Sequence, residues 1–470
     1  MLRNAPQSLI NELSAALPGQ VTQNETELNR HASDESFHQA IRPDAIVMPR
    51  STSDVQLVMR LCSAANVPVI PFGVGSSLEG QIIPVEGGIT LDFSEMNKIL
   101  EICPDDLIVV VQPGLRRIPL NDRLAREGLF FSVDPGADAT LGGMASTGAS
   151  GTTTVRYGSM RENVMALEAV LADGTVVRTG SRARKDSAGY DLTRLLVGSE
   201  GTLAVITELT LRVFGIPEAM SGAYCTFNRL SDGVAAATLL VKQGLPIARC
   251  EFLDGLSIKA INAYQGTTLK ELPTMFLEFH GSKKSITDQA DEAGEIFKEY
   301  GASDFTWTAD EGERRKLWQA RHNAYPAVLA TQTGATALTT DSAVPLSRLP
   351  EAVSYAEQVF SDQPFSWSML GHVADGNFHA LLMFDPNDEG AMVAAKAAST
   401  KLTARVIELG GTCTGEHGIG LGKRESLVNQ VGPETIELMR SVKNTFDPGN
   451  ILNPGKILFP AGLEKEAKLR

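Results

Sequence analysis

Two glycine-rich segments lie between short β-type runs in the first half of the chain, and they restrict the fold more than any other feature. The first is Pro71–Gly80, and the second runs from Asp134 to Gly158. Successive backbone N–H groups in such loops can form a concave nest for an anion such as a pyrophosphate. The alternative, plain flexible loops, is less attractive because both segments adjoin apolar runs.

The common nucleotide-binding motifs do not fit these segments. After Gly73 and Gly75 four residues precede Gly80, which misses the dinucleotide fingerprint, and no acidic residue ends a following strand at the expected distance. The P-loop motif has a further glycine five residues before the glycine of its Gly-Lys pair. The two Gly-Lys pairs of this chain have His417 and Asn450 at that position, which excludes a P-loop. We therefore expect a different scaffold to hold the anion.

The pattern of apolar residues changes near Phe214. Before it, short runs predict strands at 45–48, 67–70, 89–92, 107–112, 166–172 and 203–214, with a helix capped by Ser53-Asp54 and running to Ala65. After it, β-type runs at 222–227, 273–279 and 366–370 alternate with longer helical patterns at 232–243, 287–300, 350–360 and 389–409. This alternation predicts an α+β domain with an antiparallel sheet and helices on one face.

The composition of the chain disfavours some classes of function. The 470 residues predict more than one domain, and 42 basic against 56 acidic residues give a net charge of -14, which disfavours nucleic acid binding. The five cysteines are scattered and form no CxxC motif, as is typical of a cytoplasmic protein whose thiols are reduced. The N-terminus has no apolar signal core and no window of 18 apolar residues occurs, so we expect a cytoplasmic chain without a transmembrane segment. Peripheral association with the inner membrane stays open.

Three of the seven histidines fall in two polar clusters, 371–379 and 411–420. His372 and His379 would point to opposite faces of one unbroken strand, but Asp375-Gly376 is a strong turn signal that can bring both rings together. Two neutral imidazoles and the carboxylate of Glu416 are the ligand set of a mononuclear Zn or Mn site with open positions. His417 is then the candidate general base. Hydrogen-bonded histidines in glycine-rich loops are the alternative, as is a structural metal.

Six motifs together resemble the FAD-linked 2-hydroxy-acid dehydrogenases of the vanillyl-alcohol oxidase superfamily: Pro71–Gly80, Leu141–Gly151, Gly198–Thr202, Gly371–His379, Gly415–Gly418 and Asn453–Lys456. The resemblance spans nearly the whole chain. It implies an α+β fold, with a two-subdomain FAD-binding domain of the p-cresol methylhydroxylase type and an α+β cap domain that carries an antiparallel sheet. The expected segments are a helical 1–40, the FAD domain 41–214, the cap 215–415, and a C-terminal segment 416–470 that completes the FAD domain and the active site.

The resemblance also implies the cofactor site. The 71–80 loop has no histidine that could tether a flavin, so noncovalent FAD is expected. Asn453 resembles the C-terminal residue that touches the flavin. The residues expected to bind the cofactor are Pro71, Gly73, Val74, Gly75, Ser76, Ser77, Leu78, Pro135, Gly136, Thr140, Leu141, Gly142, Gly143, Ser146, Gly148, Ala149, Gly151, Tyr157, Gly158, Glu200, Gly201, Val205, Ile206 and Asn453.

For the reaction, the resemblance implies His372, His379 and Glu416 as metal ligands, His417 as base and Asn377 as a substrate-orienting residue. Arg321, which taken alone reads as a solvated helix charge, resembles the arginine that clamps the substrate carboxylate, a task suited to its planar fork. Relatives acting on D-2-hydroxyglutarate have a lysine ahead of the motif that reads Asp341-Ser342-Ala343-Val344-Pro345 here, and this chain has threonine. We therefore expect a D-2-hydroxy monocarboxylic acid, with D-lactate favoured.

Several alternatives stay open. A glycolate oxidase FAD subunit, a D-2-hydroxyglutarate dehydrogenase and a nonredox flavoprotein transferase use related machinery. The expected partners are a small 2-hydroxy acid and an electron acceptor that the residues do not identify, whether a quinone, a cytochrome or an electron-transfer flavoprotein.

Overall fold

The computed structural model describes residues 2–460, and its chain forms two compact units. Within the described residues, unit 1 comprises 2–150, Ser159–Ile216 and 416–460, and unit 2 comprises Gly151–Gly158 and Pro217–Gly415. Residues 1–40 are therefore grouped with unit 1, and the last ten residues of the expected segment 416–470 lie outside the described residues.

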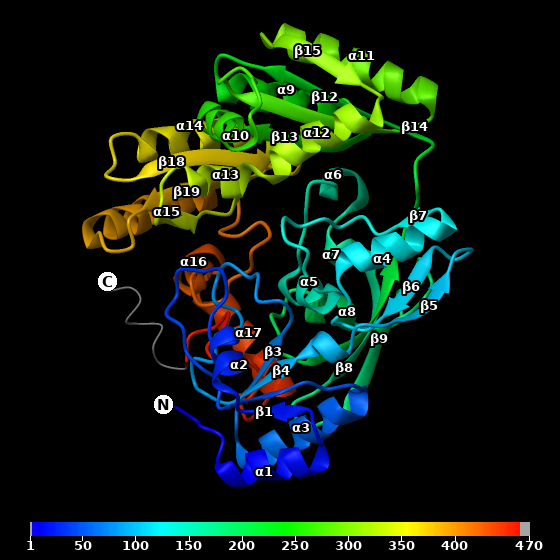
Figure 1. Ribbon diagram of the computed structural model, residues 1–470, viewed down its shortest axis with the longest axis vertical. Coiled ribbons are helices and arrows are strands. Elements are labelled where there is room, and N and C mark those ends of the chain that lie inside the picture. The colour runs from blue at the N-terminus through cyan, green and yellow to red at the C-terminus, as the bar shows by residue number, and fades with distance from the viewer. Residues whose placement is uncertain (1, 461–470) are drawn as a thin grey trace. The chain divides into compact units, whose positions relative to one another are not determined.

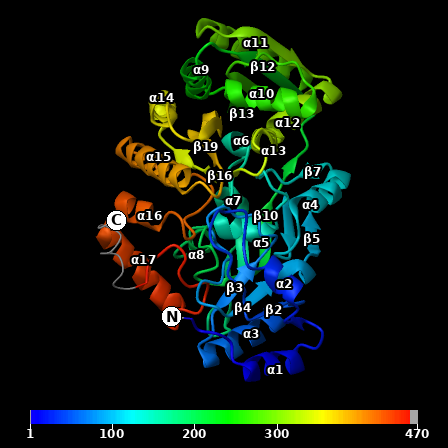
Figure 2. The ribbon, with the colours of Figure 1, turned by 60° about the vertical axis from the view of Figure 1, so that its left-hand side comes forward.

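The first sheet of unit 1 has parallel strands at its centre. β2 (Ala45–Val47), β4 (Ile89–Asp92) and β3 (Val69–Phe72) pair in parallel, and β1 (Val21–Thr22) adds an antiparallel edge. Helix α3 (Thr52–Ala65) connects β2 to β3, and α1 (Gln7–Ala16) packs beside it, as Figure 2 shows. The predicted cap at Ser53-Asp54 is wrong: Ser51 caps α3, because its hydroxyl accepts the Asp54 amide at 3.2 Å.

The second sheet of unit 1 is antiparallel, in the order β5-β6-β10-β8-β9. Its strands are β5 (Ile99–Cys103), β6 (Ile108–Val111), β8 (Val164–Val170), β9 (Val176–Gly180) and β10 (Val205–Arg212). Short helices pack leucines such as Leu120, Leu141 and Leu196 against it. The remaining elements up to residue 215 are α2 (Glu25–Arg30), η1 (Phe93–Glu95), α4 (Arg117–Leu124), η2 (Ala125–Glu127), β7 (Leu129–Phe130), α5 (Leu141–Thr147), α7 (Met160–Asn163), α8 (Leu192–Leu196) and β11 (Phe214–Gly215).

The C-terminal segment of unit 1 returns to the first sheet. After helices α16 (Arg424–Val431) and α17 (Pro433–Phe446), Leu452 forms a parallel bridge with Val69 at the start of β3. The guanidinium of Arg3 donates to the Asn450 carbonyl at 2.6 Å. Ile451 and Leu452 share one core with Leu9 and Leu13 of α1, the blue helix of Figure 1. Both ends of the sequence thus contribute to one core.

Unit 2 is built on one antiparallel sheet, which within the described residues has eight strands. They are β12 (Ala219–Thr226), β13 (Ile247–Leu253), β14 (Thr274–Gly281), β15 (Ser303–Thr308), β16 (Thr336–Thr339), β17 (Ser342–Ala343), β18 (Ser366–His372) and β19 (Asn377–Phe384). Their order is β15-β12-β14-β13-β18-β19-β16, and β17 pairs with β19. The antiparallel sheet expected from the sequence is confirmed.

Helices cover both faces of this sheet, so the prediction of helices on one face is wrong. On one face lie α9 (Leu230–Lys242), α11 (Lys283–Glu299), α14 (Leu349–Phe360) and α15 (Glu389–Glu408), packed on residues such as Met275 and Leu277. On the other lie α10 (Gly255–Gln265), α12 (Glu311–His322) and α13 (Ala324–Ala330), packed on Phe276 and Leu381. Both faces of the strands are apolar, which requires a cover on each. The unit also contains α6 (Thr154–Tyr157), η3 (Leu346–Arg348) and η4 (Val373–Asp375).

No helix among residues 2–460 combines the length and the apolar character needed to cross a bilayer.

Candidate active site

A tight hairpin in unit 2 brings two histidines together. Strands β18 and β19 pair so that His372 lies opposite Asn377, and His379 follows two residues later on the same face. The rings of His372 and His379 have centroids 5.5 Å apart and lie nearly perpendicular. Gly376 closes the turn with a φ of +74°, and a Cβ there would lie 2.3 Å from the Val344 carbonyl oxygen. The turn predicted at Asp375-Gly376 is confirmed.

Hydrogen bonds to the Nδ1 atoms define the tautomers of both rings. Nδ1 of His379 lies 3.1 Å from the Thr340 carbonyl, and Nδ1 of His372 lies 2.7 Å from a carboxylate oxygen of Glu251. Both partners are acceptors, so each Nδ1 carries the hydrogen and each neutral ring has its lone pair on Nε2. This is the state in which imidazole ligates a metal, and the acceptors are those usual behind metal-bound histidine.

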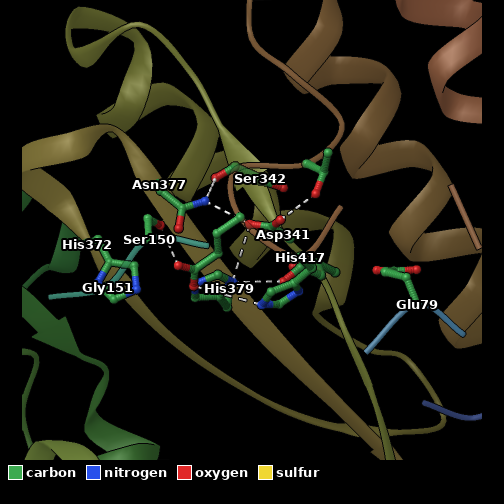
Figure 3. A network of polar contacts seen from close by, with 12 residues as sticks. Glu79, Ser150, Gly151, Asp341, Ser342, His372, Asn377, His379 and His417 are labelled. Carbon is green, nitrogen blue, oxygen red and sulfur yellow. Dashed lines mark hydrogen bonds and ion pairs between the residues drawn. The ribbon is translucent and has the colours of Figure 1, made fainter. Parts of the chain in front are cut away.

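Asn377 and Asp341 form the polar centre of the hairpin face. The Asn377 amide donates to Asp341 Oδ1 at 2.9 Å and to the Ser342 carbonyl at 3.1 Å. The other oxygen of Asp341 accepts from the Thr414 hydroxyl at 2.7 Å, so this carboxylate also holds the chain ahead of Gly415. The Asn377 Oδ1 atom is buried and has no protein partner among the described residues. A hydroxyl donor of a small molecule would satisfy that atom (Figure 3).

Helix α12 places a row of large polar side chains over β13 and β14. Arg314, Trp318 and Arg321 recur at helical spacing and share one side of the helix. Arg321 is 8% exposed, and its Nε and Nη2 lie 2.9 and 2.7 Å from Glu251 Oε2. The guanidinium is therefore held along one edge, and its Nη1 side remains for another acceptor.

A second buried carboxylate, Glu278 on β14, lies on the same sheet face. It accepts from Arg314 Nη1 at 3.0 Å and from His280 Nε2 at 2.8 Å, while Arg249 lies 3.6 Å away. Burial alone raises the pKa of Glu278, but Arg249, His280 and Arg314 outweigh burial and lower this pKa to about 2. Burial lowers the pKa of His280, whose Nδ1 accepts from the Tyr157 hydroxyl at 2.7 Å.

In unit 1, the segment that begins at Glu416 is held by side chains distant in sequence. The Ser150 hydroxyl donates to Glu416 Oε2 at 2.5 Å, and the Gln81 amide donates to the His417 carbonyl at 2.7 Å. Glu200 accepts from the backbone amides of Ile419 and Gly420 at 2.6 and 2.8 Å. Burial raises the pKa of Glu200 to about 7 although both amides favour the ionised form. These contacts fix the backbone on either side of the histidine.

Asn453 and Lys456 close the same network from the C-terminal side. The Asn453 amide donates to the carbonyls of Gln81 and Glu200 at 2.9 and 2.7 Å. The Lys456 ammonium donates to the Ile83 carbonyl at 2.6 Å, and burial lowers its pKa to about 7. Three segments of unit 1, around residues 81, 200 and 453, are thus joined through buried hydrogen bonds.

The two glycine-rich loops of unit 1 touch each other. A Cβ on Gly73 would lie 2.3 Å from the hydroxyl of Thr140, which caps α5 by accepting the Gly143 amide at 3.3 Å. Ser77 in the first loop donates to Asp34 at 2.8 Å. Gly73 thus leaves the space that the Thr140 side chain fills, and at this point the two loops meet, which fits an anionic cofactor bound by both.

Family comparisons match this arrangement along most of the chain. Residues 43–180 match the FAD binding domain family, and residues 216–457 match the C-terminal domain of the FAD linked oxidases. This chain belongs to the FAD-linked oxidases.

The relatives of this FAD-linked oxidase include two D-lactate dehydrogenases. A probable mitochondrial D-lactate dehydrogenase of Danio rerio is 46% identical over 91% of this chain and 87% of its own. A mitochondrial D-lactate dehydrogenase [cytochrome] of Arabidopsis thaliana is 39% identical over 97% and 81%. The glycolate oxidase subunit GlcD of Bacillus subtilis is 33% identical over 88% and 89%.

Solved structures show the same fold. The 4-ethylphenol oxidase of Gulosibacter chungangensis superposes with a TM-score of 0.80 at 18% identity, covering 99% of this chain and 98% of that one. A substrate-bound p-cresol methylhydroxylase gives 0.79 at 17% identity, covering 96% and 97%. The expected fold, of the p-cresol methylhydroxylase type, is confirmed.

The predicted site residues of this FAD-linked oxidase fall into two sets. Unit 2 holds His372, His379, Asn377 and Arg321 together on or over the hairpin face of its sheet. Unit 1 holds Glu416, His417, Asn453 and most of the predicted cofactor residues. Gly151, Tyr157 and Gly158 are grouped with unit 2, where Tyr157 bonds His280, so their contact with a flavin stays a prediction.

Sequence reasoning missed the two carboxylates behind the histidines. Glu251 lies in the apolar run Cys250-Glu251-Phe252-Leu253, and a lone acidic residue in a buried strand was the available signal. Asp341 was recognised as part of a motif but not as the residue that joins Asn377 to Thr414.

Proposed function

We propose that this chain is an FAD-dependent dehydrogenase that oxidises a D-2-hydroxy monocarboxylic acid, D-lactate favoured, to the 2-oxo acid. The proposal rests mainly on the hairpin face of unit 2. There the imidazoles of His372 and His379, the Asn377 amide with its unsatisfied buried oxygen, and Arg321, paired with Glu251, occur together. Two relatives over most of the chain are named D-lactate dehydrogenases, which supports D-lactate among such acids.

We propose His372, His379 and Glu416 as ligands of one divalent cation, Zn or Mn. Chain connectivity supports the third ligand. Gly415 packs so closely on Asn377 that a Cβ would lie 2.2 Å from the amide nitrogen, and Glu416 follows through one peptide bond, about 3.8 Å between Cα atoms. Two neutral imidazoles and one carboxylate leave open positions, as catalytic rather than structural sites do. The cation, when bound, acts as a Lewis acid that lowers the pKa of the substrate hydroxyl.

The roles of the remaining residues follow from their chemistry. Arg321 binds the substrate carboxylate through its Nη1 side, because Glu251 already occupies the other edge. Asn377 Oδ1 accepts the hydroxyl hydrogen in the initial complex and so orients the hydroxyl. That hydrogen then leaves Asn377 and passes to the imidazole of His417 as general base. Bound FAD would supply the redox chemistry.

We propose that FAD binds noncovalently along the two touching loops of unit 1, at residues 71–78 and 135–149, with Glu200, Gly201, Val205, Ile206 and Asn453. The match of residues 43–180 to the FAD binding domain family supports the two loops of this set. The cytoplasmic location stays a prediction; two relatives carry the word mitochondrial in their names. A quinone, a cytochrome and an electron-transfer flavoprotein all stay open as the electron acceptor.

Oxidation of glycolate, as the FAD subunit of a larger assembly, is the second candidate. The relative named glycolate oxidase subunit GlcD, 33% identical over 88% of the chain, favours it. D-Lactate and glycolate share the carboxylate and hydroxyl that Arg321 and Asn377 would bind, and they differ by one methyl group.

The test is anaerobic reduction of the bound flavin by a panel of D- and L-2-hydroxy acids, with and without a chelator. We expect bleaching of the flavin absorbance by D-lactate, slower bleaching by L-lactate and glycolate, and loss of bleaching after chelation. Faster reduction by glycolate than by D-lactate would favour the second candidate.

Replacing His417 by Ala should leave FAD bound but abolish substrate bleaching, because the hydroxyl proton loses its acceptor. General bases contribute about 10²–10⁴-fold to rate. His322→Ala, on the solvent side of α12, is the matched control and should bleach at the wild-type rate. Near-normal bleaching in His417→Ala would show that another group takes the proton.

A further inference from the structure

Glu251 is a fully buried carboxylate, 0% exposed, on the buried strand β13. A charge in such a place is strongly unfavourable unless partners compensate it. The register of the sheet supplies one partner, since β13 pairs with β18 so that Glu251 lies directly opposite His372. Helix α12 supplies the other, Arg321. Folding therefore brings one acidic side chain between the proposed substrate clamp and one proposed metal ligand.

The two oxygens of Glu251 serve these partners separately. Oε1 lies 2.7 Å from His372 Nδ1, while Oε2 lies 2.9 Å from Arg321 Nε and 2.7 Å from Arg321 Nη2. The first contact keeps the hydrogen on Nδ1 and the lone pair on Nε2. The second holds the guanidinium by one edge and turns the other edge outward. One carboxylate sets the orientation of both groups.

We propose that Glu251 is a positioning residue that sets the affinity of the cation site and of the carboxylate site together. This inference rests on the proposed function of His372 and Arg321. Glu251 contacts neither cation nor substrate; it acts through the tautomer of the histidine and the direction of the arginine. Orienting partners of this kind change metal affinity about 10- to 100-fold when they are altered.

The isosteric amide tests the tautomer directly. In Glu251→Gln the carbonyl oxygen must face Arg321, which has only donors, and the amide NH₂ then faces His372 Nδ1. A donor opposite Nδ1 favours the tautomer that has its hydrogen on Nε2. In that tautomer Nε2 has no lone pair with which to bind a metal. Volume and packing are almost unchanged, so loss of metal would report the tautomer and not a cavity.

Glu278→Gln is a matched control from the same sheet face. Glu278 is as buried as Glu251, and it also bridges a histidine, His280, and an arginine of α12, Arg314. Its histidine is not a proposed ligand. The two variants should lower thermal stability to a similar degree and differ in metal affinity.

The experiment measures Mn²⁺ binding to chelator-stripped, FAD-loaded protein by the electron paramagnetic resonance signal of free Mn²⁺. We expect the Kd of Glu251→Gln to rise about 10- to 100-fold, and that of Glu278→Gln to stay within about threefold of wild type. At saturating Mn²⁺, kcat of Glu251→Gln should recover. The KM for D-lactate should stay raised, because Arg321 has lost the ion pair with Glu251 that orients it.

Equal shifts in both variants, or an unchanged Kd in Glu251→Gln, would overturn the positioning role while leaving the proposed function intact. A wild-type chain that binds neither Mn²⁺ nor Zn²⁺ would overturn both. A kcat that stays low at saturating metal with an unchanged KM would also count against positioning.

Discussion

Each histidine of the β18–β19 hairpin has an acceptor behind it that fixes its proton. For His372 it is Glu251, and for His379 it is the Thr340 carbonyl, with Asp341 Oδ1 3.6 Å from the same nitrogen. The same Asp341 also holds Asn377 and Thr414. At the scale of single residues, the proposed chemistry depends on side chains that do not react.

Gly415→Ala tests how closely Asn377 is placed. The added Cβ would lie 2.2 Å from the Asn377 amide nitrogen and 3.0 Å from Asp341 Oδ1, so Asn377 must move. Overpacking of this kind costs about 1–3 kcal/mol, and we expect kcat with D-lactate to fall about tenfold or more with FAD content unchanged. Gly215→Ala, where a Cβ would meet nothing within 4 Å, is the control for stopped-flow flavin reduction. Equal rates in both variants would contradict the placement.

Glu251 shows why the site was only partly predictable. The turn at Asp375-Gly376 is a local signal, so the meeting of His372 and His379 could be expected from the sequence. The partner of His372 depends on which residue of β13 lies across from it, and that register is set by the whole sheet. A single Glu between Cys250 and Phe252 gives no local indication of its partner.

At the scale of elements, each strand predicted from an apolar run overlaps an observed strand, but the buried strands β13 and β19 were not predicted, and neither was the charged helix α12. Helix α12 begins Glu-Gly-Glu-Arg-Arg-Lys, and its apolar spacing is too weak to predict which sheet face it covers. In the fold, Trp318 and Ala320 join the apolar core of this face, and Arg314 and Arg321 bond carboxylates of β14 and β13. These buried ion pairs, which have no sequence period, thus add to the apolar contacts that position the helix.

The contact between α12 and β14 should be sensitive to acid. The pKa of Glu278 is about 2 in the fold against an ordinary 4.5, so its contribution is fully present above about pH 4.5 and is lost as pH falls toward 2. The difference corresponds to about 3 kcal/mol. We expect Glu278→Gln to lower the free energy of unfolding at pH 7, with the gap to wild type shrinking below pH 4.5.

Urea unfolding followed by tryptophan fluorescence at pH 7, 4 and 3 measures this gap. Glu311→Gln, an exposed carboxylate on the same helix, is the control and should track wild type at every pH. A constant gap between wild type and Glu278→Gln across this range would show that its ionisation is not linked to folding.

At the scale of the whole molecule, the two units carry different reporters. Trp307, Trp318 and Trp367 all lie in unit 2, whereas the proposed FAD loops lie in unit 1. Tryptophan emission therefore follows one unit and flavin release the other. A chain of this kind is not expected to unfold in a single two-state step.

Metal and flavin should each stabilise a transition that one of these reporters follows. Ligand at 100 times its Kd stabilises the folded state by about 2.7 kcal/mol, so saturating Mn²⁺ should raise the midpoint of the tryptophan transition by several degrees. FAD added to FAD-depleted protein should instead raise the midpoint temperature at which the flavin is released. A tryptophan transition that does not respond to chelator would contradict the assignment of His372 and His379 as ligands.

The bridge between Val69 and Leu452 has a consequence for the order of folding during synthesis. Almost the entire second unit, Pro217–Gly415, is one continuous stretch and can assemble while it leaves the ribosome. The four strands of the first sheet, β1 to β4, are all synthesised by Asp92, whereas their neighbour Leu452 follows 360 residues later (452 − 92). This sheet is thus completed long after its own strands are made, and a ribosome that stops short of Leu452 releases a chain whose flavin unit lacks part of its core.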